Sequence, residues 1–163
     1  MYPIHDTEVL LLLAMTLSSK RRPAELVEIM AAVDLLHGSI PSELKLIEAF
    51  HRLSTHGLIS EAAGRFTLTP DAQKIMADQS GKKVAAEERV FGIKENLAVY
   101  DSNGEHAPVL VTTEQLGAAI LAHRTSAKGS GRNLLAPKPK AAEGNGRRAG
   151  QWRKPAAGRR RQT

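Results

Sequence analysis

The chain has 163 residues, of which 42% are apolar, 4% aromatic and none cysteine, and its formal net charge is +6. This length accommodates one ordinary domain with appendages, and the lack of cysteine excludes disulfides, thiolate zinc sites and a cysteine nucleophile. The longest apolar run, Val9 to Met15, is shorter than the roughly 20 residues that cross a bilayer. Asp6 and Glu8 stand where a signal peptide would be cationic. We therefore expect a cytoplasmic protein without membrane contact.

The charge is distributed unevenly along the chain. From Arg124 onward there are 12 Lys and Arg residues against one acidic residue, Glu143, so this segment carries +11. Residues 1–123 hold the other 11 basic and 16 acidic residues and carry −5. This asymmetry indicates a polyanionic partner for the basic segment rather than for the acidic part of the chain.

Two helices are predicted near the N-terminus. Asp6 is the expected N-cap of the first, which runs to about Ser18, because its carboxylate can accept a free N–H of the first turn. This helix is apolar nearly all round and should be central to the core. Pro23 suits the first position of the second helix. Its buried stripe recurs at three- to four-residue spacing and comprises Leu26, Ile29, Met30, Val33 and Leu36.

A third helix is predicted over about residues 42–56, after a turn in which Gly38 adopts the left-handed conformation. Gly57 should end it in the same way. Two short extended segments, 58–61 and 65–69, then form a hairpin, and Thr69-Pro70-Asp71 starts a fourth helix through Met76. The expected buried stripe of the third helix comprises Leu46, Ile47, Phe50 and Leu53.

Beyond residue 80 the sequence predicts a mostly polar helix over 82–96 and a hairpin of segments 97–100 and 109–112 around Asp101-Ser102-Asn103-Gly104. Thr112 and Gln115 have capping-box spacing for a last helix to about His123, which buries Leu116 and Ile120. From about Ser126 the chain cannot bury enough apolar surface to offset its ordering entropy. We therefore expect a mainly α domain with a short β-hairpin (1–80), a small α+β extension (81–124) and a disordered basic tail (125–163).

The stretch Leu53-Ser54-Thr55-His56-Gly57-Leu58-Ile59, followed by Gly64-Arg65-Phe66-Thr67-Leu68-Thr69, resembles the recognition-helix exit and wing of winged helix-turn-helix transcription regulators. It is similar to the multiple-antibiotic-resistance and phenolic-acid regulator families, and the resemblance covers about residues 6–78. It implies a winged helix whose third helix enters the DNA major groove and whose wing touches phosphate. It also implies a homodimer. The implied DNA contacts are Ser42, Lys45, Arg52, Thr55 and Arg65.

Two acidic residues on the same helix, Glu43 and Glu48, lead to an alternative. A glutamate can read cytosine, but two of them facing a polyanion also suit a helix that holds a protein partner. The loop Lys20-Arg21-Arg22 is open to two interpretations, a phosphate contact or a solvated charge run.

The basic tail carries further candidate nucleic-acid contacts. Its cationic blocks suit sequence-independent phosphate binding, and its tryptophan suits stacking on an unpaired base; the alternative is a solubilising tail or one that folds back on the acidic body. These candidates are Arg147, Arg148, Trp152, Arg153, Lys154, Arg159, Arg160 and Arg161.

No enzyme, metal or cofactor is predicted. His51 and His56 are five residues apart rather than the three or four that place two ligands on one helix face, and His56 should meet the last carbonyls of its helix. Asp6 and Glu8 are interpreted as helix-surface acids, as are Glu87 and Glu88, and no nucleophile elbow, P-loop or dinucleotide fingerprint occurs.

Two functions follow from these features. The first is a DNA-associated winged-helix protein, a transcription regulator, in which the basic tail adds sequence-independent phosphate binding. Double-stranded DNA is the first expected partner, and RNA is the alternative. The second is a winged-helix module that binds a protein through its acidic third helix and RNA or an acidic protein through its tail.

Overall fold

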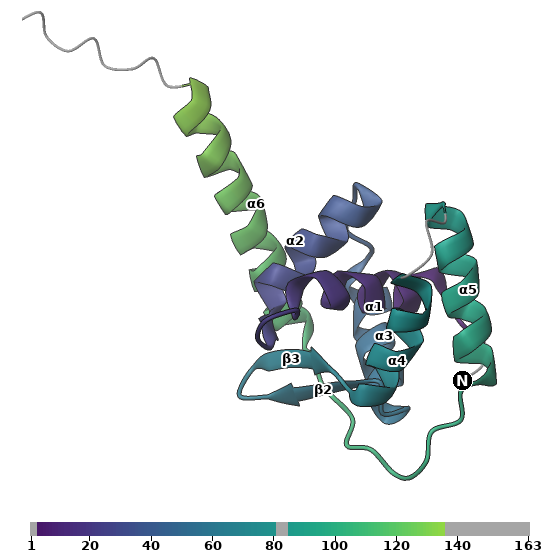
Figure 1. The fold of residues 1–163 in the computed structure, drawn as a ribbon. Helices are drawn as coiled ribbons and strands as arrows, with labels where there is room; N and C mark the ends of the chain where they lie inside the picture. Colours follow the sequence, from purple (N-terminus) through teal and green to yellow (C-terminus); the bar gives the residue numbers. More distant parts are fainter. Residues whose placement is uncertain (1–2, 81–84, 136–163) are drawn as a thin grey trace, which may run out of the picture. The chain divides into compact units, whose positions relative to one another are not determined.

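The structure is a computed structural model and describes residues 3–80 and 85–135. Within these ranges the protein is mainly helical, as predicted, with six helices (Figure 1). Its one sheet is antiparallel and has three strands rather than the two of the predicted hairpin. None of these helices is both long and apolar enough to span a membrane. In chain order the elements are α1 (Asp6–Ser18), β1 (Ala24–Glu25), α2 (Leu26–His37), α3 (Glu43–Thr55), β2 (Ile59–Ala62), β3 (Arg65–Leu68), α4 (Pro70–Ser80), α5 (Ala86–Val99) and α6 (Thr113–Leu135).

Helix α1 is central, as predicted, and contacts α2, α3, α4, α5 and β3 (Figure 1). The predicted N-cap is wrong by one residue, because His5 occupies that position. The backbone N–H of His5 donates to Glu8 Oε2 at 3.0 Å, which is one half of a capping box. Asp6 instead lies in the first helical turn, where its carboxylate forms an ion pair with Lys94.

Helix α2 begins three residues later than predicted, because the chain before it is extended. Ala24 and Glu25 form β1 and pair with β3, so Pro23 precedes a strand rather than opening a helix. Glu25 is the N-cap, and its backbone N–H donates to Glu28 Oε2 at 2.9 Å. The predicted stripe is fully buried at Ile29, Met30 and Val33, whereas Leu36 is 43% exposed.

The predicted hairpin after α3 is confirmed. Strands β2 and β3 pair antiparallel from Ile59 opposite Leu68 to Ala62 opposite Arg65, and the sheet order is β1-β3-β2. Gly38 (φ +74°) and Gly57 (φ +69°) end α2 and α3 in the left-handed conformation, as predicted. The next helix, α4, starts at Pro70 as predicted and extends past the predicted end to Ser80.

The predicted second hairpin, over residues 97–112, is wrong. Leu97 is fully buried within the last turns of α5, and residues 101–112 contain no strand. Val109 and Val111 are buried while Leu110 between them is 74% exposed. This alternation is also what a half-buried strand shows, but these side chains pack on the body without a partner strand.

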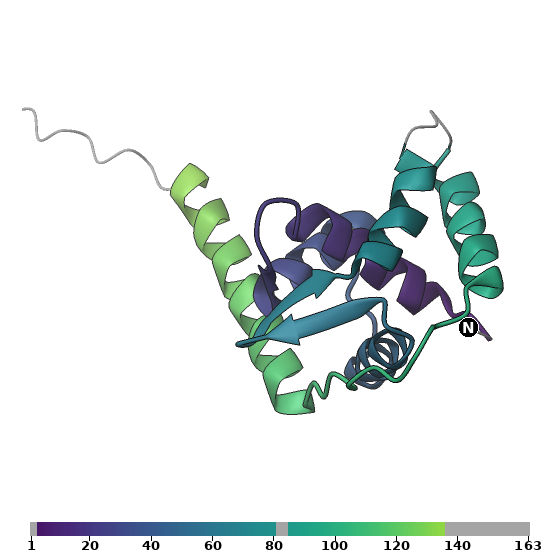
Figure 2. The ribbon, with the colours of Figure 1, turned by 60° about the horizontal axis from the view of Figure 1, so that its bottom comes forward.

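The segment from α5 to α6 passes along α3 (Figure 2). The backbone N–H of Val109 donates to the hydroxyl oxygen of Ser54, a fully buried residue of α3, at 2.8 Å. His106 lies against Gly57, where an added Cβ would come within 2.3 Å of the imidazole Nε2. These two contacts hold the segment against the C-terminal half of α3.

Helix α6 begins as predicted, with reciprocal hydrogen bonds from the Thr112 N–H to Gln115 Oε1 (3.0 Å) and from the Gln115 N–H to Thr112 Oγ1 (3.2 Å). Leu116 is fully buried and Ile120 is 8% exposed, also as predicted. The helix continues to Leu135, past its predicted end at about His123.

The chain divides into two compact units, residues 1–127 and 128–163. The first unit contains one apolar core, to which the helices after residue 80 contribute Ile93, Leu97 and Leu116. These helices therefore pack on the same core as α1 to α4. Of the second unit, the structure describes residues 128–135, which continue α6.

Candidate nucleic-acid interface

Helix α3 carries most of the residues that the resemblance implies as DNA contacts. Its apolar face packs into the core, and Leu46, Phe50 and Leu53 are fully buried. Of the candidates, Ser42 and Lys45 at the N-terminal end are exposed. Thr55 at the other end is half-buried, and its hydroxyl donates to the carbonyl oxygen of Arg52 at 2.9 Å. The hydroxyl proton of Thr55 is therefore already used within the helix.

Arg52 is held by a buried carboxylate. Its Nη1 lies 2.6 Å from Glu8 Oε1, and the side chains are 18% and 1% exposed respectively. Its Nη2 also donates to the carbonyl oxygen of Pro3. Separating a buried pair leaves an uncompensated charge and costs about 3–5 kcal/mol. A phosphate contact by Arg52 would have to offset that cost, so the geometry opposes the role that the resemblance implies.

The interpretation of Glu8 as a surface acid is wrong. Positions 8, 12 and 15 follow the i, i+4, i+7 spacing of one helix face, and Leu12 and Met15 are fully buried. That spacing is the sequence signal that would have identified Glu8 as buried. Its partner, Arg52, comes from another helix and carries no such signal.

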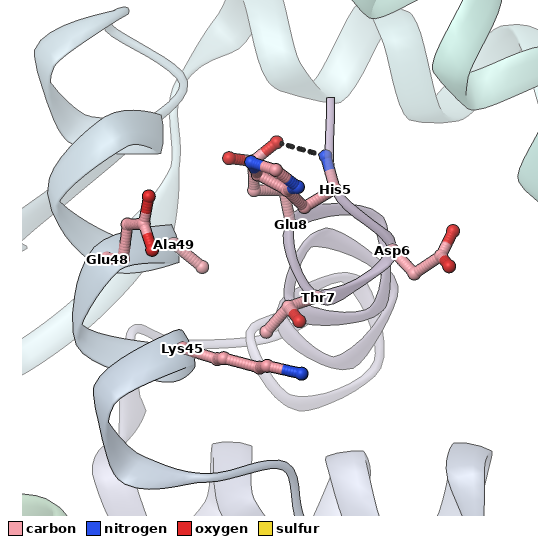
Figure 3. Close-up of a pocket in the computed structure, with 7 residues that line it drawn as sticks. All are labelled: His5, Asp6, Thr7, Glu8, Lys45, Glu48 and Ala49. Atoms are coloured by element: carbon pink, nitrogen blue, oxygen red, sulfur yellow. Dashed lines mark hydrogen bonds between the residues drawn. The ribbon is translucent and has the colours of Figure 1, made fainter. Parts of the chain in front are cut away.

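A cleft of about 330 Å³ separates the first turn of α1 from α3 (Figure 3). Lys45 extends from α3 toward α1, and Glu48 also lines the cleft. On the α1 side, the hydrogen bond and charge of Lys94 hold the pKa of Asp6 below its usual value, so this carboxylate stays ionised. The cleft thus places Lys45 among three carboxylates, those of Asp6, Glu8 and Glu48, and its electrostatics do not favour a phosphate inside it.

Arg65 lies at the start of β3, opposite Glu25 of β1. The Arg65 Nη2 and Glu25 Oε1 atoms are 3.2 Å apart, and the side chains are 47% and 52% exposed. Exposed pairs contribute about 0–1 kcal/mol. In contrast with Arg52, this arginine can exchange its carboxylate for a phosphate at little cost.

The remaining basic candidates lie outside α3 and the hairpin. Lys20 and Arg21 are exposed, whereas Arg22 forms an ion pair with Glu28. The tail candidates all lie outside the described residues, namely Arg147, Arg148, Trp152, Arg153, Lys154, Arg159, Arg160 and Arg161.

The histidines whose contacts the structure describes take part in hydrogen bonds and packing within the fold, and His123 Nε2 of α6 lies 2.9 Å from Asp34 Oδ2 of α2. His56 Nδ1 lies 2.7 Å from the carbonyl oxygen of Arg52, which confirms the predicted contact with the last turn of α3. No three His, Asp or Glu side chains among residues 3–80 and 85–135 come close enough together to hold a metal ion. Comparison with known protein families, curated proteins and solved structures finds no match to this chain.

Proposed function

We propose that this protein is a DNA-associated winged-helix protein and that its basic C-terminal segment supplies most of the affinity. The observation that carries this proposal is the separation of charge, +11 from residue 124 onward against −5 for residues 1–123. Neutralising phosphates releases condensed counterions, and this sequence-independent term dominates non-specific binding. The acidic first unit cannot supply that term by itself.

The topology supports the winged-helix part of the proposal. The order α1-β1-α2-α3-β2-β3, with β1 added to the β2–β3 hairpin on the β3 side, suits a helix-turn-helix followed by a wing. In such proteins α3 is the helix that enters the major groove.

Among residues 1–127, three of the candidate DNA contacts agree with the geometry. Ser42, the N-cap of α3, and Lys45 in its first turn are exposed, and the ion pair that holds Arg65 is itself exposed. Arg52 is excluded by its buried partner. We therefore propose that Lys45 and Arg65 orient the body on phosphates, while base-specific contacts from α3 contribute little.

The salt dependence of binding tests this division of roles. In the full chain, the seven cations at 147, 148, 153, 154, 159, 160 and 161 are changed to glutamine, and a matched variant carries Lys45→Gln with Arg65→Gln. Each phosphate contact contributes about 0.9 to the slope of log K against log salt. The tail variant should make that slope less negative by up to about 6, and the body variant should make it less negative by at most about 2.

Equal slopes for the tail variant and the unchanged protein would contradict the proposal. Duplex DNA, duplex RNA and single-stranded RNA are compared in the same assay, and tighter binding to either RNA would replace DNA as the partner. Selection from a randomised duplex pool with the tail variant tests sequence reading. A common enriched sequence would show that α3 reads bases after all.

A second candidate function is supported by the outward face of α3. Leu44 is 73% exposed beside the exposed acid Glu48, and an exposed leucine with an acid suits a protein partner better than DNA. Changing Glu43 and Glu48 together to lysine discriminates the two functions. It should strengthen DNA binding if α3 faces DNA and leave it unchanged if this face holds a protein.

A further inference from the structure

A second hollow, of about 680 Å³, lies away from α3, between the start of α2, the β2–β3 turn and α6. Volumes of roughly 300–1,000 Å³ are typical of small-molecule sites. All of its lining residues belong to the first unit. Of these lining residues, only Arg65 also belongs to the proposed nucleic-acid interface.

The floor of this groove is apolar and is kept open by small side chains. Helix α6 contributes Ala118, Ala119 and Ala122, which the three- to four-residue spacing places on one helix face. Phe66 and Leu110 add larger apolar surface, and Leu110 is 74% exposed. A ligand with an apolar surface would cover this side chain together with the alanine face of α6.

The charged groups that line the groove are Glu25, Glu61 and Arg65. Arg65 is neutralised by Glu25 at 3.2 Å. Glu61 accepts a hydrogen bond from the backbone N–H of Gly64 at 3.1 Å, and no basic side chain of the described residues forms an ion pair with it. The lining therefore carries one uncompensated negative charge beside an apolar floor.

We propose that this groove binds a small amphiphilic cation, an apolar body that carries one protonated or quaternary amine. The apolar body covers the alanine face of α6 and the Leu110 side chain, and the cationic group lies next to Glu61 and Glu25. The net negative charge of the lining favours a cationic ligand, because it would repel an anionic ligand of the same shape. The proposal does not depend on the nucleic-acid function.

Two probes of similar shape and opposite charge test the sign of the ligand. Tetraphenylphosphonium is titrated into the full-length protein, with affinity measured by calorimetry and location by backbone amide chemical shifts. Tetraphenylborate is titrated in the same way. The cation should shift the amides of residues 118–122 and 61–66, and the anion should leave these amides unchanged. Equal shifts from both probes, or cation shifts spread over acidic residues elsewhere, would overturn the proposal.

A substitution of Glu61 and a matched control test the role of its negative charge. Glu61→Gln keeps an oxygen for the Gly64 N–H and should weaken the cation about threefold to fivefold, the range expected for an exposed charge pair. Glu114→Gln, on the first turn of the same α6 but outside the groove, should change nothing. Equal effects of the two variants would refute the role of Glu61.

Filling the groove is the second independent readout. Ala118→Trp places a large ring over the alanine face and should reduce cation affinity at least about tenfold, since it removes most of the apolar contact. Leu121→Trp, at a 63% exposed position of α6 outside the groove, is the matched control. Unchanged affinity in Ala118→Trp would show that the cation binds elsewhere and would overturn the proposal.

Discussion

The ion pair between Glu8 and Arg52 gives the sharpest prediction about this fold. Arg52→Met keeps an unbranched side chain of similar helix propensity but leaves Glu8, which is 1% exposed, without its cation. Removing one partner of a buried pair costs about 3–5 kcal/mol. For a unit of this size, each kcal/mol corresponds to about 3–5 °C in Tm. We therefore expect Arg52→Met to lower Tm by about 10–20 °C.

The opposite substitution should be milder. Glu8→Gln retains an oxygen that can accept the His5 N–H, which now donates to Glu8 Oε2 at 3.0 Å. The Arg52 side chain is 18% exposed and keeps part of its hydration when the carboxylate is lost. We expect a cost of about 1–2 kcal/mol. The double variant should cost less than the sum of the single ones, because no unpaired charge stays buried.

The assays are equilibrium unfolding in urea, which gives the free energy of unfolding, and thermal unfolding, which gives Tm. Both are followed by circular dichroism on all three variants and the unchanged protein. Arg22→Met is the matched control, because its ion pair with Glu28 is exposed, with side chains 53% and 36% accessible. That variant should lose at most about 1 kcal/mol. If Arg52→Met costs no more than Arg22→Met, the buried pair does not form in solution, and Arg52 becomes available for DNA.

Three further predictions concern single contacts. Gly38→Ala should cost about 1–2 kcal/mol of stability, because φ at this position is +74°, although the new Cβ would meet no other atom. Gly57→Ala should cost more, because φ is +69° and the new Cβ would also meet an imidazole ring. Thermal unfolding compares the two variants. Ser54→Ala removes the hydroxyl oxygen that accepts a hydrogen bond from the buried backbone N–H of Val109. We expect a loss of about 1–3 kcal/mol of stability and faster hydrogen exchange of that amide. Because Lys94 lowers the pKa of Asp6, the stability from this pair is present above the unfolded value of 3.8 and is lost as the pH falls through the folded pKa. Lys94→Met should return the Asp6 titration, followed by NMR, toward 3.8, and an unchanged titration would refute the pair.

Local signals predicted the helices and the first hairpin well. Apolar spacing marked α1 and α3, and the capping pair Thr112 and Gln115 marked the start of α6. The failures occurred where a local signal was outweighed by a distant partner. Pro23 resembles a helix start by itself, but the two residues after it pair with a strand about 40 positions further along the chain. Two residues are too few to show the period of a strand.

The candidate site shows the same limit. Helix periodicity correctly left Arg52 off the apolar stripe of α3, but it could not show that the N-terminus of α1 reaches that side. Exposed candidates such as Lys45 needed only local reasoning, because no other part of the described chain covers them. Arg65 is intermediate, since its partner Glu25 belongs to the strand that the sequence did not reveal.

The central position of α1 has a consequence for biosynthesis. Its side chains are covered by α2, α3, α4 and α5, all of which are translated after it. At about 5–20 residues per second, the ribosome needs about 3–12 s to proceed from the end of α1 to the end of α4. Until α4 is complete, the apolar side chains of α1 lack part of the neighbours that cover them, so we expect the folding yield in cells to depend on chaperones that shield nascent chains.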